Sequence, residues 1–476
     1  MPNSSLDLDH GTMQRMGRRV ADLVAHHLAT LRDQPTQQFL TREATLRHAT
    51  APSPTAGTSF EELIGTLETE ILPYHTREPH PGFVAYVQSC SSFPGIMGDW
   101  IASGFNFFAG FWAVAPGPTA LEVAVIDWFR TWLGMPAGTG GLLTTGGSAA
   151  TFTAVVAARH AVVGDDPARI LRCVLYCSAQ AHSSVVRAAW MAGLPRDHVR
   201  EIPIDDAFRI RPDVLAEMLN QDRARGLLPM MVVASAGTTN TGAVDPLHAI
   251  ADLCAEEQVW LHVDGAYGGF AVLTPSGKAA LAGIERADSV TLDPHKWLYV
   301  PFECGCLLAR NPARLSAAFR IVPDYLKDVE QSEAVPGETN FSDYGEQLTR
   351  YARAIKVWLA VSYYGTDAIG EAIAGGIRRA EEAEELVRAS GGLEVLSPAS
   401  LGIFCFRAHP RGLDDPERLD ALNERINQRV NANARYFISS TRIKGVFSLR
   451  ICTPGFRTTA EDIRRLIGEI VEAAGE

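Results

Sequence analysis

A lysine and an aspartate, each at the end of an apolar segment, are the residues of this sequence best suited to covalent chemistry on a carbonyl compound. Lys296 comes just after the apolar segment 289–292, which Pro294 ends, and large apolar side chains resume at Trp297. Burial disfavours an ammonium ion, so we predict a lowered pKa and a neutral, nucleophilic amine that can form an imine. A lysine whose charged end reaches solvent is the alternative.

Asp264 occupies the same kind of position thirty-two residues earlier. The apolar segment 259–263 predicts a strand that ends at this carboxylate, and Gly265, Gly268 and Gly269 leave room for a flat ligand beside the backbone. The spacing to Lys296 fits a strand, a short helix and a strand, which would bring both residues to one edge of a sheet. An acid for a pyridinium nitrogen and a lysine for an imine are the two protein groups that pyridoxal 5'-phosphate (PLP) requires.

The segments His-Val-Asp264-Gly-Ala-Tyr and Asp-Pro-His295-Lys296-Trp resemble the cofactor motifs of the PLP-dependent group II amino-acid decarboxylases, closest to the aromatic-L-amino-acid decarboxylases. The resemblance extends in motif order over residues 80–360. It implies an α/β protein of PLP fold type I, like aspartate aminotransferase, with a large, mostly parallel sheet. It further implies decarboxylation of an aromatic L-amino acid to the amine and CO2, with PLP as cofactor.

Further motifs gain a role from this resemblance. Gly146-Gly147-Ser148 precedes a helical run and would bind the phosphate through free N–H groups, although an ordinary capped turn has the same pattern. His182, which alone would be read as a capping or core residue, would stack on the cofactor ring. The complete predicted cofactor site comprises Gly147, Ser148, His182, Thr239, Asp264, Ala266, Asp293, His295 and Lys296.

The resemblance also predicts residues for catalysis and substrate binding. Tyr325, in Pro-Asp-Tyr-Leu-Lys, matches the catalytic loop whose tyrosine donates a proton, with His182 assisting; a surface loop with an incidental tyrosine is the alternative. Tyr86 and Trp112 fall in segments that resemble the substrate pocket, as does His80, and half of the aromatic residues there are expected to be core. Thr349 falls where relatives vary with substrate class.

Three other functions stay open at this stage. An aldehyde synthase of this family carries phenylalanine for the loop tyrosine or asparagine for the stacking histidine, whereas this chain keeps Tyr325 and His182. An aminotransferase would clamp the substrate carboxylate with an arginine, and Arg450 is a candidate. A non-catalytic scaffold would not need Asp264 and Lys296 together.

The remaining pattern predicts three domains. An amphipathic helix between residues 13 and 31, an extended linker at 35–57 and a capping box at Ser59 to Glu62 predict a helical arm over residues 1–79. Apolar segments near residues 170, 229, 259 and 289 alternate with helical runs and predict a PLP-binding domain over residues 80–365. Residues 366–476 predict a small α+β domain. By resemblance, the arm wraps the second subunit of a homodimer whose active site lies at the interface.

Composition excludes other classes of function. The net charge of −12 leaves no basic surface for nucleic acid, and no segment predicts a membrane span or a signal peptide. The eight cysteines follow no disulfide framework, and Cys304 and Cys306 lack zinc-site spacing. We therefore expect a cytoplasmic enzyme with reduced core cysteines, a small-molecule amino-acid substrate and no metal.

Overall fold

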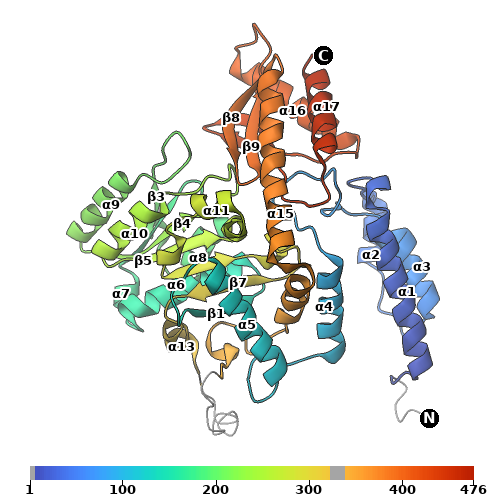
Figure 1. The fold of residues 1–476 in the computed structure, drawn as a ribbon, viewed down its shortest axis with the longest axis horizontal. Coiled ribbons are helices and arrows are strands. Elements are labelled where there is room, and N and C mark those ends of the chain that lie inside the picture. The colour runs from blue at the N-terminus through green and yellow to red at the C-terminus, as the bar shows by residue number, and fades with distance from the viewer. Residues whose placement is uncertain (1–5, 322–337, 476) are drawn as a thin grey trace.

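A seven-stranded sheet forms the centre of the larger part of the molecule (Figure 1), in a computed structural model that describes residues 6–321 and 338–475. The strand order is β1-β7-β6-β5-β4-β2-β3. Strands β2 to β6 pair in parallel, and only β7 runs antiparallel to its two neighbours, so the predicted mostly parallel sheet is confirmed. The strands are β1 Gly140–Thr144, β2 Cys173–Ser178, β3 Val199–Ile202, β4 Leu228–Ser235, β5 Trp260–Gly265, β6 Ser289–Leu292 and β7 Gly305–Ala309.

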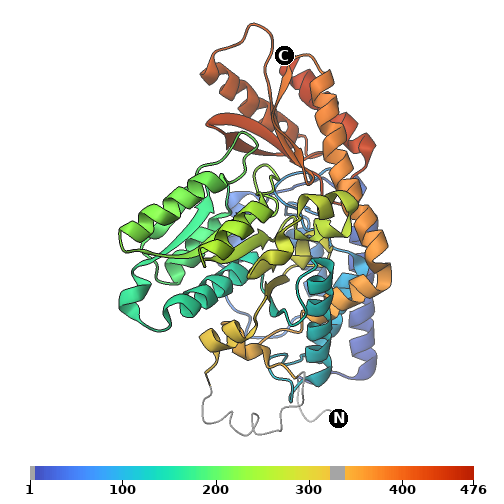
Figure 2. The same cartoon turned by 60° about the vertical axis from the view of Figure 1, so that its left-hand side comes forward.

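Helices cover both faces of this sheet (Figures 1 and 2). Helix α6 crosses β4 to β7, and its small buried side chains, among them Ala150, Ala154 and Ala157, allow it to lie close to the strands. The surrounding helices are α5 Pro116–Trp132, α6 Gly147–Val163, α7 Pro167–Ile170, α8 Ser183–Met191, α9 Pro212–Ala224, α10 Leu247–Glu256, α11 Pro275–Ala280, α12 Pro294–Trp297 and α13 Ala313–Phe319.

A four-stranded antiparallel sheet with order β10-β11-β9-β8 forms the smaller lobe, which confirms the α+β pattern predicted for the C-terminal part. The long helix α15 connects the two lobes and breaks at Gly365, where φ is +74°. Val84 also joins the small sheet, because its N–H donates to Phe437 and its carbonyl accepts from Cys452. Because a residue of the predicted PLP-binding domain pairs with the small sheet, the boundaries of the three domains stay a prediction. The elements are α15 Ala354–Ala389, β8 Leu393–Ser400, β9 Ile403–Ala408, α16 Pro416–Ala432, β10 Ser439–Ile443, β11 Val446–Cys452 and α17 Ala460–Gly475.

The N-terminal arm lies beside the large sheet domain and α4 Phe93–Phe105 (Figure 1). Its helices are α1 His10–Ala29, α2 Arg42–Ala49 and α3 Phe60–Thr66. The serine half of the predicted capping box is confirmed, since the Ser59 hydroxyl accepts from the Glu62 N–H at 3.3 Å. The predicted extended linker is wrong for α2, which begins because the Thr41 hydroxyl caps the Ala44 N–H at 3.2 Å. No residue of α1 is buried within the chain, so its apolar stripe needs another surface.

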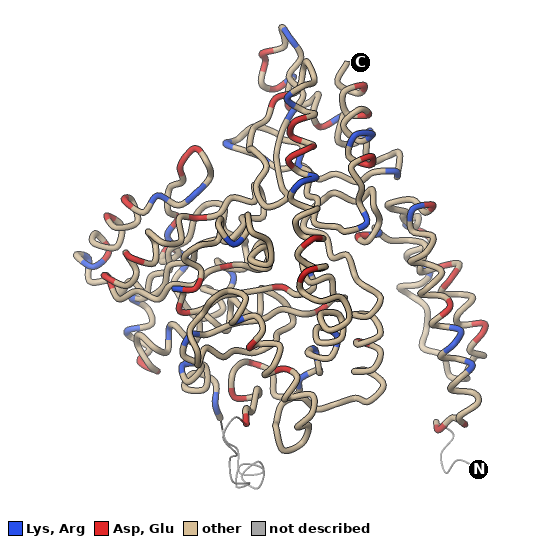
Figure 3. The backbone as a smooth tube through the Cα atoms, viewed as in Figure 1, with Lys and Arg blue, Asp and Glu red and all other residues tan. Residues whose placement is uncertain are grey.

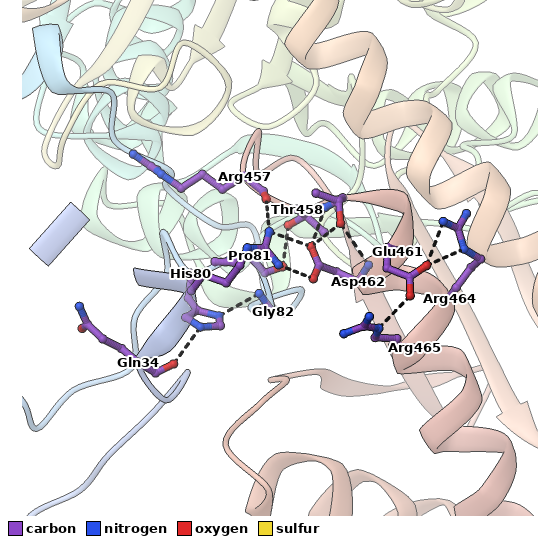
Figure 4. A network of polar contacts seen from close by, with 12 residues as sticks. Gln34, His80, Pro81, Gly82, Arg457, Thr458, Glu461, Asp462, Arg464 and Arg465 are labelled. Carbon is purple, nitrogen blue, oxygen red and sulfur yellow. Dashed lines mark hydrogen bonds and ion pairs between the residues drawn. The ribbon is translucent and has the colours of Figure 1, made fainter. Parts of the chain in front are cut away.

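A polar network fastens the arm to the C-terminal lobe (Figure 4). Arg32 pairs with Asp462 at 2.7 Å. His80 is buried, and its two ring nitrogens bond to the carbonyl of Gln34 and the N–H of Gly82. Since both nitrogens are used here, His80 positions the chain leaving the arm and does not reach a substrate cavity.

The positions of the charged residues and of the cysteines agree with the expectations drawn from the composition. Basic and acidic residues alternate along the whole described backbone, without a continuous basic stretch (Figure 3). All eight cysteines are free and buried, which confirms their prediction as reduced core residues. Over the described residues, the search for membrane spans finds no helix that combines the necessary length with the necessary apolar character.

Candidate active site

A cavity of about 240 Å³ lies at the carboxyl ends of β4, β5 and β6, in front of the first turn of α6. Parallel neighbours end at the same edge, and Gly265 of β5 pairs in register with Leu292 of β6. The structure brings together all nine residues of the predicted cofactor site, which line this cavity: Gly147, Ser148, His182, Thr239, Asp264, Ala266, Asp293, His295 and Lys296.

Lys296 reaches the cavity from the short helix α12, which begins at Pro294 directly after β6. Its Nζ lies 2.9 Å from the Asp293 carboxylate. Burial opposes the charge of the amine, but the hydrogen bond to Asp293 and the charges of Asp293 and Asp264 outweigh it and raise the pKa of Lys296. The predicted lowering of this pKa is therefore wrong for the chain without cofactor. The amine must lose a proton before it can attack a carbonyl group.

Asp264 is the last but one residue of β5, and its carboxylate accepts a hydrogen bond from the Ala266 N–H at 3.1 Å. Burial raises its pKa, while the charge of Lys296 opposes the rise. A nearby cation stabilises the charged form of such a buried carboxylate, in addition to the hydrogen bond from Ala266. Asp264 is thus suited to hold a protonated ring nitrogen within the cavity.

His182 caps the start of α8 and lines the same cavity. Its Nδ1 lies 2.8 Å from the Ser184 hydroxyl, which fixes the orientation of the imidazole. Burial lowers the pKa of His182, so the ring is neutral at pH 7. A flat, neutral and fixed ring can cover one face of a planar cofactor.

The start of α6 has the features of an anion site. Gly146 lies at φ +151° and contributes no side-chain cap, so the first N–H groups of this 17-residue helix stay available to an anion. A Cβ on Gly147 would lie 3.0 Å from Asp293 Oδ2 and 3.1 Å from the Ala266 methyl group. Any side chain at position 147 would therefore crowd Asp293 and Ala266 on the cavity wall.

A neighbouring cavity of about 350 Å³ shares His182, Thr239 and Lys296 with the first. The predicted substrate residue Tyr86 lies on it, half exposed and with a positive φ of 48°. Residues that sequence reasoning did not assign to the site complete its wall: Val87, Asn240, Ser439 and Ser440. Val87 lies about 350 residues before Ser439 and Ser440 in the sequence, and no local sequence motif predicts that these residues share a cavity.

Two predicted site residues, Trp112 and Thr349, do not line either cavity. Trp112 is half-buried, and its backbone N–H donates to the Asn340 side-chain oxygen at 3.0 Å. Thr349 is exposed. Tyr325 lies outside the described residues, so its role stays a prediction from the sequence.

Arg450 is buried beside the second cavity. Its guanidinium donates to the carbonyls of Tyr86 at 2.7 Å, Thr239 at 2.6 Å and Asn240 at 3.1 Å, and to the Ser439 hydroxyl at 3.1 Å. Every nitrogen of the group is thus engaged with the protein. Arg450 holds three wall segments together, which disfavours the carboxylate clamp of an aminotransferase.

Comparisons with known proteins agree with this site. Residues 43–409 match the pyridoxal-dependent decarboxylase conserved domain. An aromatic-L-amino-acid decarboxylase of Bacillus atrophaeus is 37% identical over 474 residues, which cover 100% of this chain and 98% of that protein. The solved structure of Oryza sativa TDC with PLP and tryptamine has a TM-score of 0.94 at 28% identity, covering 99% of both chains. That of Rhodiola rosea 4-hydroxyphenylacetaldehyde synthase has 0.90 at 28% identity, covering 98% of this chain and 99% of the other. The prediction of fold type I is confirmed.

The cavity fits PLP by its own chemistry. The free N–H groups of α6 match a phosphate, Asp264 matches the ring nitrogen, and Lys296 matches the aldehyde. Asp293 Oδ1 is buried and accepts no hydrogen bond from the described residues, so the cavity holds an acceptor that a ligand or solvent must satisfy.

Proposed function

Since this chain belongs to the pyridoxal-dependent decarboxylase family, we propose that it converts an aromatic L-amino acid to the corresponding amine and CO2. PLP is its cofactor. The observation that carries the proposal is that Lys296 and Asp264 lie on one cavity, at the ends of adjacent parallel strands, with His182 on its wall. The aromatic preference rests on the relatives named above and on Tyr86 beside the second cavity.

Each residue of the cavity has a definable part in this reaction. PLP supplies an electron-accepting ring that stabilises the charge left on Cα when CO2 departs. Lys296 holds the cofactor covalently and releases it to the substrate amine, and Asp264 keeps the ring nitrogen protonated. His182 covers the ring and excludes water from one face. Orientation by these contacts selects which bond to Cα is broken.

A proton must then reach Cα before the amine leaves. We assign this step to Tyr325, with His182 as its assistant. The fixed Nδ1 contact of His182 with Ser184 leaves Nε2 as the nitrogen that can exchange a proton in the cavity. The assignment of Tyr325 rests on its sequence motif alone.

We also propose that two copies form a homodimer and complete each other's active sites. Apolar side chains are exposed on α1 and α4, including Met13 at 51%, Trp100 at 45% and Phe105 at 72%. Trp112 and Thr349 line neither cavity of their own chain, so we assign them to the substrate pocket of the other copy. The free, buried cysteines support a reducing compartment, and we place the enzyme in the cytoplasm.

The substrate is tested with the purified holoenzyme and single L-amino acids. We expect CO2 and amine in equal amounts from one or more of tryptophan, tyrosine, phenylalanine and dopa, and much slower turnover of histidine and glutamate. Products are measured by CO2 release and chromatography of the amine. Keto acid in place of CO2, limited to one equivalent per subunit unless a second keto acid is added as amino acceptor, would indicate an aminotransferase. No product under either condition would favour a scaffold.

An aldehyde synthase is the second candidate, because one solved relative bears that name. If Tyr325 returns the proton to Cα, Tyr325→Phe should reduce amine output by roughly 10²-fold or more, the usual contribution of a general acid. Aldehyde and hydrogen peroxide should then appear, with oxygen consumed. Tyr363→Phe, at an exposed tyrosine of α15, is the control. Unchanged amine output would remove Tyr325 from the mechanism.

A further inference from the structure

A larger cavity, of about 500 Å³, lies at the edge of the seven-stranded sheet opposite to the PLP cavity. Its wall includes Trp260 at the start of β5, Asp288 before β6 and Arg310 after β7. The other ends of β5 and β6 carry the PLP cavity. These strands have six and four residues, so they separate the two cavities by roughly 13–20 Å, at about 3.3 Å a residue.

Two arginines present unused N–H groups to this cavity. Arg310 is fixed because its Nε donates to the Ala287 carbonyl at 3.1 Å and its Nη2 to the Glu285 carbonyl at 2.6 Å. Its Nη1 forms no hydrogen bond with any described residue. Arg314 is exposed, and over the described residues its side chain forms neither a hydrogen bond nor an ion pair. A third arginine of the wall, Arg286, is paired with Asp252 at 2.7 Å.

A carboxylate lies on the same wall. Asp288 Oδ2 accepts from the Leu261 N–H at 2.8 Å, and its other oxygen has no donor among the described residues. The charge of Arg310 acts on this carboxylate, but the two groups do not form an ion pair within 4 Å. The cavity therefore offers separate sites for an anion and for a cation.

Several of the remaining wall residues are apolar, while Gln258 and Asn311 add polar side chains. Val162 of α6, Cys254 of α10 and Val259 contribute side chains, and the indole of Trp260 forms a flat surface. The Trp260 Nε1 donates to the Ser289 hydroxyl at 2.8 Å, which holds the ring in place. An apolar or aromatic group can pack against this apolar part of the wall.

We propose that this cavity binds a free apolar or aromatic α-amino acid at a site separate from the PLP cavity. The carboxylate would bind to Arg310 and Arg314, the ammonium group to Asp288, and the side chain to Trp260 and its apolar neighbours. This inference goes beyond the proposed reaction and does not depend on it. An amine that lacks the carboxylate would meet two guanidinium groups without compensation, so the site distinguishes amino acids from amines.

The proposal is tested by calorimetric titration of holoenzyme treated with borohydride, which fixes PLP on Lys296 and prevents exchange with an added amino acid. L-phenylalanine is the probe, and phenethylamine and 3-phenylpropionate each lack one charged group. We expect saturable binding of L-phenylalanine and at least roughly tenfold weaker binding of both analogues, the effect of about 1.4 kcal/mol for one lost charged contact. An absence of L-phenylalanine binding would overturn the proposal.

Single-residue variants test whether L-phenylalanine binds at this cavity. Arg314→Glu and Asp288→Asn should each weaken L-phenylalanine binding at least tenfold, while Arg411→Glu should leave it unchanged. Arg411 is also exposed, on the turn before α16, and its replacement changes the net charge by the same amount as Arg314→Glu. Equal affinity in all three variants would place the binding elsewhere and refute this site. Amine formation is measured in a separate assay. Loss of L-phenylalanine binding at this cavity is therefore distinguished from failure of the proposed decarboxylation.

Discussion

Replacing Lys296 with alanine is expected to lower amine formation by roughly 10⁴-fold or more, the scale of loss when a covalent catalyst is removed. Lys296 is the amine that shares the cavity with Asp264 and with the phosphate site of α6. Without it, PLP can still bind through its phosphate and ring nitrogen, but it has no amine to attach to. The protein should therefore bind PLP more weakly and lose the attachment that borohydride makes permanent.

The measurement combines turnover with mass mapping of the borohydride-treated protein. In the parent enzyme, the peptide that contains Lys296 should carry the added mass of the reduced cofactor. Lys278→Ala, at an exposed lysine of α11, should keep both the attachment and the turnover. Attachment at another lysine in the borohydride-treated parent enzyme would show that Lys296 is not the covalent residue.

Much of the fold could be predicted because its central strands are short apolar segments between clear breaks. The segments near residues 229, 259 and 289 became β4, β5 and β6. The edge strands were missed for physical reasons. β1 begins with Gly140 and Gly141, which resemble a turn, although Gly141 is required because a Cβ there would lie 1.9 Å from the Leu307 carbonyl oxygen. β3 is partly exposed and so lacks an apolar signal.

The candidate site also has one part that could be predicted from the sequence and one part that could not. Seventeen residues line the cofactor cavity, and the nine that the sequence names lie in short motifs at or just after strand ends. The second cavity could not be predicted, because Asn240, Ser439 and Arg450 meet only when the small sheet packs against the large one. The pKa of Lys296 was predicted in the wrong direction because Pro294 starts a helical turn, and this turn places Asp293 within 2.9 Å of the amine.

Replacing Asp264 with alanine is expected to lower amine formation by roughly 10³-fold, as for a charged group that stabilises the transition state. Without the carboxylate, the pyridine nitrogen of the cofactor has no anion to keep it protonated and becomes a weaker electron acceptor. Lys296 remains, so the borohydride-stable attachment should persist. Turnover and attachment thus separate this variant from Lys296→Ala.

A cofactor with a permanent positive charge tests the reason for this loss. PLP methylated on the ring nitrogen needs no proton there, so it should restore part of the activity of Asp264→Ala while leaving Lys296→Ala inactive. It should not restore Asp293→Ala, because Asp293 lies against the amine of Lys296 and acts on that group. If the methylated cofactor rescues Asp293→Ala but not Asp264→Ala, then Asp293 is the carboxylate that faces the ring nitrogen, and the orientation of PLP derived from the strand ends is wrong.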